Sequence, residues 1–323
     1  MYDWSDFMYP DIIIGRLWIQ VYDLLAFIAS YVVMFYNDLR VKNKPRPMGY
    51  KTMVVRAKLS LKHGKFATYL VKTMAILESE TFTMSYIMFV FVNFFFGKLV
   101  GTGANYFAAL VIVPILWTFI SINYGFNPLE QIDFVATSFP LYLIFAKFCC
   151  FFAGCCNGIP WEHGVYIVDL QQKHFPVQLV EALWALLIFI FLTKYRKSGK
   201  AKTGTVYPLY VILYCATRFC SEFLRIEENI FGPLKLYHIL CLIGLVYGVI
   251  CWIVVAKCRD KVNAYYDKKY AEAEEELVEI NKVVEVENEK YRRQMQSEQQ
   301  KKDNKKKRKE RQKKAKSSAV KKL

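Results

Sequence analysis

Seven long apolar stretches constrain the fold of this chain more than any other feature. A membrane-spanning helix needs about 20 mostly apolar residues, and such stretches fall at 11–36, 82–99, 104–123, 132–153, 177–193, 204–225 and 234–256. Hydrophobic residues make up 54% of the 323 residues and aromatic residues 16%, which excludes a disordered chain and a short disulfide-stapled secreted domain. We therefore predict an all-α polytopic membrane protein with about seven transmembrane helices.

Basic residues indicate the orientation of these helices. The loop 37–81 holds ten Lys and Arg against three Asp and Glu, and the loop 194–203 holds five basic residues and no acidic one. The segment after residue 257 is also strongly basic. Since basic loops stay on the cytoplasmic side of a membrane, and since seven spans put the termini on opposite sides, the sequence predicts the N-terminus outside and the C-terminus in the cytoplasm.

The end of the chain differs in composition from the rest, because residues 257–323 carry half of the 44 Lys and Arg residues. We predict a seven-span membrane domain over 1–256 and a basic cytoplasmic tail over 257–323. Apolar residues at a/d heptad spacing predict a short coiled coil over 264–286, followed by a disordered Lys-rich segment. The heptad positions are Tyr266, Tyr270, Ala273, Leu277, Ile280 and Val284.

The charge of the tail suggests a partner. Clustered Lys and Arg suit anionic membrane lipids, and the alternative is a solvated tail that only reinforces the topology. The terminal lysines have no aromatic residues among them, so base stacking has no support and no specific nucleic-acid partner is predicted.

Ionisable side chains inside the predicted spans point to a functional site, since a charge in hydrocarbon normally faces a cavity or a partner. In the span 204–225, Arg218 and Glu222 are four residues apart on one helical face and can pair. Under the predicted topology, further polar groups fall in the same outer half of the bilayer: Arg16, Tyr22, Asp23, Lys147, Gln178, Glu181 and Arg225. Two arginines and a lysine can hold a phosphate group there. The alternative is a set of structural ion pairs that tie the helices together.

Cysteines and histidines give weaker signals. Four cysteines gather at the outer end of the span 132–153: Cys149, Cys150, Cys155 and Cys156. Their spacing matches no usual zinc pattern, so we predict no metal site and interpret them as small packing residues, with an outer disulfide or redox sensitivity as the alternative. We expect His163 and His174 to be solvated loop residues and His238 to be buried.

Four motifs, in order along the chain, resemble those of prolipoprotein diacylglyceryl transferases. The stretch Lys147–Gly158 reads KFCCFFAGCCNG and resembles the family signature in its form Arg-x-Gly-Cys-Phe-x-Ala-Gly-Cys-Cys-x-Gly. Phe175–Glu181 is similar to the family's His-Pro-x-Gln-Leu-Tyr-Glu, and Tyr207–Arg225 is similar to its Arg-Phe-x-x-Glu-Phe-x-Arg helix. Ile12–Phe27 resembles the first span of the family, and Tyr22 falls on its functional tyrosine.

This resemblance implies an enzyme that moves a diacylglyceryl group from phosphatidylglycerol to the thiol of a lipobox cysteine in an exported preprotein. The implied products are a thioether and glycerol phosphate, with no cofactor, and the implied location is the bacterial plasma membrane. Catalytic roles are implied for Arg218, Lys147 and Tyr22, with the two cations facing the phosphate leaving group. Contacts to the substrate are implied for Glu222, Arg225, Gln178, Glu181, Gly154, Asn157, Gly158 and Tyr106.

The sequence departs from the family pattern where a base is needed. The family's His-Gly-Gly in the third span has no counterpart, because the segment from Asn105 reads NYFAA. Lys147 replaces the signature arginine and cannot donate the two parallel hydrogen bonds of a guanidinium group. Cys150 replaces an asparagine of the commoner signature. An incoming thiol must lose a proton, so the alternatives are Tyr22, Tyr106 or unaided thiolate formation beside the cations.

Two other functions fit the same features. A diverged member of the family would transfer its lipid-derived group to a different acceptor, and a non-catalytic membrane scaffold would bind anionic lipid and recruit a partner through the basic tail. The missing His-Gly-Gly favours these two functions, whereas the retained Arg218, Glu222, Gln178 and Glu181 favour the transferase. A transferase should keep its activity without the tail, and a scaffold should depend on it.

Overall fold

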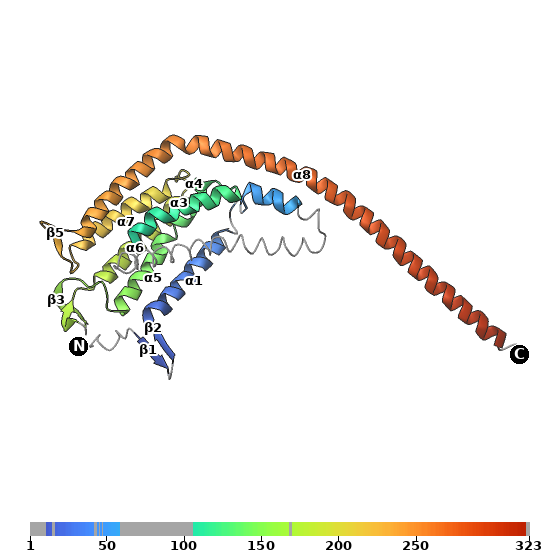
Figure 1. Cartoon of the computed structure of the whole chain (residues 1–323), viewed down its shortest axis with the longest axis horizontal. Coiled ribbons are helices and arrows are strands. Elements are labelled where there is room, and N and C mark those ends of the chain that lie inside the picture. The colour runs from blue at the N-terminus through green and yellow to red at the C-terminus, as the bar shows by residue number, and fades with distance from the viewer. Residues whose placement is uncertain are drawn as a thin grey trace. The chain divides into compact units, whose positions relative to one another are not determined.

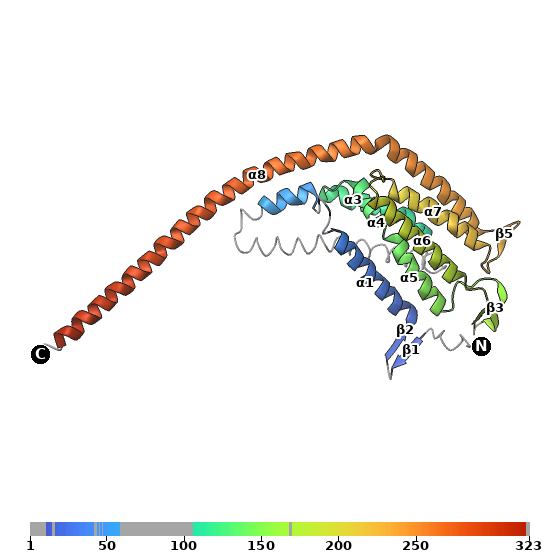
Figure 2. The same ribbon diagram turned by 180° about the vertical axis from the view of Figure 1, so that it is seen from behind.

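The described part of the chain is mostly helical (Figures 1 and 2). The structure, a computed structural model, describes residues 11–14, 17–41, 44, 46, 48–58, 106–167 and 170–320. The chain divides into two compact units, one made of Met1–Thr52 and Lys72–Lys269 and the other of Met53–Val71 and Tyr270–Leu323. The predicted span 82–99 lies outside the described residues, as do Arg16 and His63.

Four helical segments of the described residues are long and apolar enough to cross a membrane. They agree with the predicted spans 104–123, 132–153, 177–193 and 234–256. The described part of the chain therefore has the architecture and composition of an α-helical membrane protein. The four segments are α3 (Tyr106–Tyr124), α4 (Pro128–Ala136) with α5 (Phe139–Phe152), α6 (Val177–Lys197), and the first part of α8 (Leu236–Val320).

The helix predicted over 11–36 begins ten residues later than expected. Helix α1 spans Val21–Val41, and the strands β1 (Asp11–Ile14) and β2 (Leu17–Gln20) form an antiparallel pair before it. Their sequences, DIII and LWIQ, are rich in β-branched and aromatic residues, which favour strands. The predicted span 204–225 is also shorter, since α7 covers Val206–Glu222.

Tyrosines hold the helices around α7 together. Tyr207, Tyr210 and Tyr214 on α7 are buried, and the hydroxyl of Tyr106 on α3 hydrogen-bonds that of Tyr210. The Tyr207 hydroxyl also donates to the carbonyl of Leu110 on α3 at 2.5 Å. Since α5 packs against α6, and α6 against α7, polar residues on the facing sides of these three helices are brought together.

The start of α7 is fixed by a buried carboxylate on α4. Asp133 accepts backbone hydrogen bonds from Gly204 at 2.6 Å, Val206 at 2.9 Å and Tyr207 at 3.1 Å. The first N–H groups of a helix have no partner within the helix, and a negative charge there also favours the helix dipole. Asp133 therefore anchors the end of α7 that lies away from Arg218 and Glu222.

Two short hairpins lie where α5 ends, α6 begins and α7 ends. Strand β3 (Pro160–Ile167) pairs with β4 (Gln172–His174), and β5 (Asn229–Phe231) pairs with β6 (Leu234–Lys235). Both hairpins sit at the same end of the helices in Figures 1 and 2. They connect the segments that carry the charged residues described below.

The end of the chain belongs to one long helix. Helix α8 continues to Val320 and so includes the Lys-rich segment, for which we predicted disorder. Residues 290–320 contain no Gly or Pro and many Lys, Arg, Gln and Ala, all good helix formers. Among the predicted heptad positions, Tyr266, Tyr270, Ala273 and Ile280 are buried. In the second unit, Lys58 lies 2.6 Å from Glu276.

Candidate functional site

The carboxylate of Glu181, in the second turn of α6, collects three cations. Lys147 Nζ of α5 lies 2.6 Å from its Oε2. Arg225 donates through Nε to Oε1 at 3.1 Å and through Nη2 to Oε2 at 2.8 Å. Arg218 of α7 donates through Nη1 to Oε1, and the Ser221 hydroxyl donates to the same oxygen at 3.0 Å. Residues from α5, α6 and α7 therefore meet at one carboxylate.

A second carboxylate completes the cluster. Glu222 Oε2 lies 2.6 Å from Arg218 Nη2, as predicted from their i, i+4 spacing, and 3.9 Å from Arg225 Nε. Three cations thus share two carboxylates, which leaves one positive charge in excess. Glu181, Arg218, Glu222 and Arg225 are at most 7% exposed. Since buried charges are costly unless paired, the excess charge suits an anionic ligand. We call these four residues and Lys147 the Glu181 cluster.

Arg225 reaches the cluster because the chain after α7 runs beside residues 153–159. We call these residues, which follow α5 and end the stretch that resembles the family signature, the signature loop. Residues Gly158 and Arg225 form an antiparallel bridge. On either side of it, Ile159 N donates to Leu224 O at 2.8 Å and Ile226 N donates to Asn157 O at 3.2 Å. The loop therefore places the third cation.

Two polar side chains, the buried Gln178 and the half-buried Asn157, hold that loop in place. Gln178 of α6 donates to the carbonyl of Cys155 at 2.6 Å and to Asn157 Oδ1 at 3.1 Å. Asn157 in turn donates to the carbonyl of Gly154 at 2.7 Å, and Gly154 has a φ of +66°, a conformation that suits glycine. Gln178, Asn157, Gly154 and Gly158 thus form one framework next to the Glu181 cluster.

Gly158 is the position in this framework where a side chain is least tolerated. A Cβ there would clash with the carbonyl oxygen of Phe175 and lie 2.8 Å from that of Leu224. We expect Gly158→Ala to destabilise the protein by about 2–3 kcal/mol, because both neighbours are backbone atoms that cannot rotate away. Thermal unfolding in detergent micelles measures this. Gly154→Ala is the comparison, since its Cβ meets nothing within 4 Å and its cost is confined to the left-handed φ of +66°; a loss of stability for Gly154→Ala as large as that for Gly158→Ala would contradict the prediction.

The two tyrosines named from the sequence are placed differently. The ring of Tyr106 packs against that of Tyr214 at 4.8 Å between centroids. Tyr214 lines a small cavity beside Lys147, Glu181 and Arg218. This cavity of about 10 Å³ has room for about one water molecule. The side chain of Tyr22 lies outside the described residues, although its backbone belongs to the first turn of α1.

The structure adds a residue that the sequence reasoning missed. Lys235, buried on β6, donates to the carbonyls of Glu222 at 2.9 Å and Arg225 at 2.5 Å. It thereby fixes the backbone that follows α7. Its sequence signal is a single lysine at the second position of the predicted span 234–256.

The histidine predictions are partly wrong. His174 is buried, not solvated, and its Nδ1 lies 2.9 Å from the carbonyl of Gly158, because β4 lies under the signature loop. His238 is buried as predicted and accepts from the backbone N–H of Lys235 at 3.0 Å. His163 lies exposed on β3, as expected.

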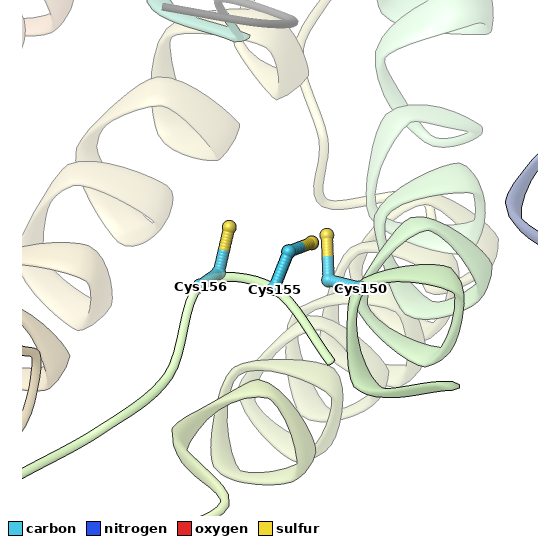
Figure 3. Close-up of side chains that lie close together, drawn as sticks. All are labelled: Cys150, Cys155 and Cys156. Carbon is cyan, nitrogen blue, oxygen red and sulfur yellow. The ribbon is translucent and has the colours of Figure 1, made fainter. Parts of the chain in front are cut away.

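Three of the four cysteines that the sequence places at the outer end of the span 132–153 lie close together. The sulfur atoms of Cys150, Cys155 and Cys156 are all within 4.8 Å of one another (Figure 3). All are free thiols, as is the buried Cys149. The neighbouring thiols of Cys150 and Cys155, together with the charges of Lys147 and Arg225, lower the pKa of the Cys156 thiol.

Comparison with known proteins identifies the family. The model of the prolipoprotein diacylglyceryl transferase family matches residues 12–254. A phosphatidylglycerol–prolipoprotein diacylglyceryl transferase of Clostridioides difficile (strain 630) is 33% identical over 135 residues, which cover 41% of this chain and 52% of the relative.

Two further relatives carry the same name. The protein of Clostridium tetani (strain Massachusetts / E88) is 31% identical over 108 residues, covering 31% of this chain and 43% of the relative. The protein of Thermotoga maritima is 25% identical over 152 residues, covering 44% and 52%. The chain thus spans about half the length of the curated relatives it matches. Because the family model matches most of its length, the chain belongs to the prolipoprotein diacylglyceryl transferase family.

Proposed function

We propose that this protein transfers the diacylglyceryl group of phosphatidylglycerol to the cysteine thiol of a prolipoprotein lipobox. The observation that carries the proposal is the Glu181 cluster, in which three cations from separate segments contact one carboxylate. The chain belongs to the family, and these cations lie in the motifs that resemble those of the family. The names of the relatives state the same donor and acceptor for those proteins.

The reaction joins the acceptor sulfur to the glycerol carbon that carries the phosphate. The C–S bond forms, the C–O bond to the phosphate breaks, and glycerol phosphate leaves with the bonding electrons. We assign the phosphate to Arg218, Lys147 and Arg225, because cations held in place before the reaction stabilise the charge that develops on the leaving group. Glu222 positions Arg218 from the neighbouring turn of α7 at 2.6 Å.

Glu181 acts in this proposal as the internal substitute for the phosphate. Its two oxygens accept from both arginines and the lysine, much as two phosphate oxygens would. A bound headgroup takes over part of these contacts, and the excess positive charge of the cluster favours the exchange. The loop framework of Gln178, Asn157, Gly154 and Gly158 then borders the headgroup, and Tyr22 and Tyr106 remain candidates for the base.

We further propose seven spans in the bacterial plasma membrane, with the N-terminus outside and the tail after 257 in the cytoplasm near anionic lipids. The basic loops 37–81 and 194–203 support this topology. It places the Glu181 cluster towards the outer leaflet, where an exported preprotein meets phosphatidylglycerol.

A transfer assay tests the proposed activity. Purified protein in micelles that contain phosphatidylglycerol is incubated with a lipobox peptide, and the peptide mass is measured. We expect the mass to increase by one diacylglyceryl group, and a peptide with Ser in place of Cys to stay unmodified. An unmodified Cys peptide in the presence of bound phosphatidylglycerol would contradict the proposal and favour another acceptor or a lipid-binding scaffold.

Truncation of the tail separates an enzyme from a scaffold. Contacts to Asn263 at 2.8 Å and Asp267 at 2.6 Å tie the start of the tail to Asn127 and Arg46, so the cut belongs after Lys269, where the first compact unit ends. We expect the variant lacking 270–323 to transfer lipid at close to the full rate, since the Glu181 cluster lies wholly within the first unit. Loss of transfer in a variant that still unfolds cooperatively would favour the scaffold.

A further inference from the structure

We propose that Cys150, Cys155 and Cys156 bind a zinc-like metal ion, whose remaining coordination position takes up the acceptor thiol as a thiolate. The binding of the acceptor thiol rests on the proposed function, whereas the metal site does not. It also supplies what the sequence lacks, since the segment from Asn105 has no counterpart to the family's His-Gly-Gly.

The three sulfur atoms are already gathered for an ion. Zn²⁺ binds thiolates at about 2.3 Å, so sulfurs around one tetrahedral ion lie about 3.8 Å apart. All three sulfurs here lie within 4.8 Å of one another, and small side-chain rotations close the difference. Figure 3 shows Cys150 at the end of α5 next to Cys155, with Cys156 one residue further along the loop.

The backbone holds this arrangement at a cost. Cys156 has a φ of 60°, and Gly154 before it has a φ of 66°. A left-handed conformation is unfavourable for a residue with a side chain, and such strain concentrates where function requires it. The turn folds the loop back onto α5, which is why the linear spacing of the cysteines did not reveal the cluster.

Nearby charges suit a metal–thiolate complex. Three thiolates around one divalent ion carry one net negative charge. Lys147 is one helical turn before Cys150, and the Arg225 guanidinium, which holds Glu181, also exerts its positive charge on the Cys156 thiol. Arg225 thus connects the thiol cluster to the cations assigned to the phosphate, so the two halves of the reaction meet at one residue.

A fourth ligand can approach from outside the protein. Cys155 and Cys156 are exposed and Cys150 is partly exposed. Three protein ligands with one open position are typical of catalytic zinc, whereas structural zinc sites are closed by four.

The metal would activate the acceptor directly. A thiol that coordinates such an ion is deprotonated outright, and its proton passes to solvent. The bound thiolate sulfur then attacks the glycerol carbon, the C–S bond forms, and the C–O bond breaks towards the phosphate. No oxidant, reductant or protein base is required.

Cobalt binding tests the metal site independently of catalysis. The full chain is purified in detergent, reduced, stripped of metal and titrated with Co²⁺, whose thiolate complexes absorb in the near ultraviolet. We expect one equivalent to bind with thiolate charge-transfer absorption, and Cys150→Ser, Cys155→Ser and Cys156→Ser each to weaken binding by about 100-fold. Cys220→Ser, which removes an exposed thiol of α7, is the matched control. No charge-transfer band, or equal binding by all four variants, overturns the site.

A second experiment tests whether the acceptor thiol binds at the fourth coordination position of the metal. Addition of a lipobox peptide to the cobalt-loaded protein should change the spectrum, whereas the Ser peptide should not. Absence of this change overturns the thiol-binding role. If the metal-stripped protein and the three cysteine variants transfer lipid at the full rate, the metal role fails while the proposed function stands. If the peptide binds the metal but no lipid is transferred, the metal site stands and the proposed function fails.

Discussion

Replacing Glu181 by Gln is expected to destabilise the protein by about 3–5 kcal/mol. The variant keeps the size of the side chain but removes the charge that Lys147, Arg218 and Arg225 share. Within the Glu181 cluster, Glu222, already paired with Arg218 at 2.6 Å, would then face two buried arginines and the partly exposed Lys147. Removing one partner of a buried ion pair leaves an uncompensated charge, which accounts for the size of the effect.

Thermal and denaturant unfolding in micelles measure this loss. Glu130→Gln is the control, because Glu130 is an exposed acid in α4 outside the cluster, and its removal should change stability little. Phosphatidylglycerol should stabilise the Glu181→Gln protein more than the wild type, because its phosphate can replace the lost charge. If Glu181→Gln unfolds at the same temperature as Glu130→Gln, the three cations do not depend on this carboxylate.

The second large effect is expected on activity. Arg218→Gln should lower the rate of lipid transfer by about 10²–10³-fold, since one preorganised donor to a developing anion contributes about that much. Arg218→Lys should not restore the rate. The Arg218 guanidinium contacts Glu181 through Nη1 and Glu222 through Nη2. A lysine has a single ammonium group and cannot contact both carboxylates in this way.

Arg196→Gln provides the matched control for this measurement. Arg196 lies at the other end of α6, about four turns from Glu181, where it donates to the carbonyl of Asp133 at 3.2 Å. Initial rates with the same lipobox peptide should leave Arg196→Gln close to the wild type. Equal rates for Arg218→Gln and Arg196→Gln would remove Arg218 from the reaction.

Periodicity and apolar length predicted much of the helical structure. The spans assigned to α3, α6 and the start of α8 agree with the structure, because long apolar runs have few other stable states in a membrane. The strands at Asp11–Ile14 and Leu17–Gln20 were missed because an apolar run of β-branched residues gives the same hydropathy signal as a helix. In the Lys-rich end of α8, high charge density favours disorder and the residue types favour a helix, so the sequence supports both states.

The sequence singled out the charged residues that the structure brings together, but it did not predict which of them are partners. Charges within apolar spans singled out Lys147, Glu181, Arg218, Glu222 and Arg225, and the Arg218–Glu222 pair followed from their spacing on one helix. The central position of Glu181 depends on how α5, α6 and α7 are rotated against one another, which the packing of their tyrosines decides. The thiol cluster likewise depends on a left-handed residue in the signature loop.

Binding of the lipid headgroup tests the central claim, that the Glu181 cluster recognises the phosphate of phosphatidylglycerol. Native mass spectrometry of the full chain released from mixed micelles measures the fraction of protein that retains phosphatidylglycerol. We predict retention by the wild type and by Arg196→Gln, and its loss in the double variant Lys147→Gln, Arg218→Gln. Equal retention of phosphatidylglycerol by the double variant, shown to be folded, would contradict the claim.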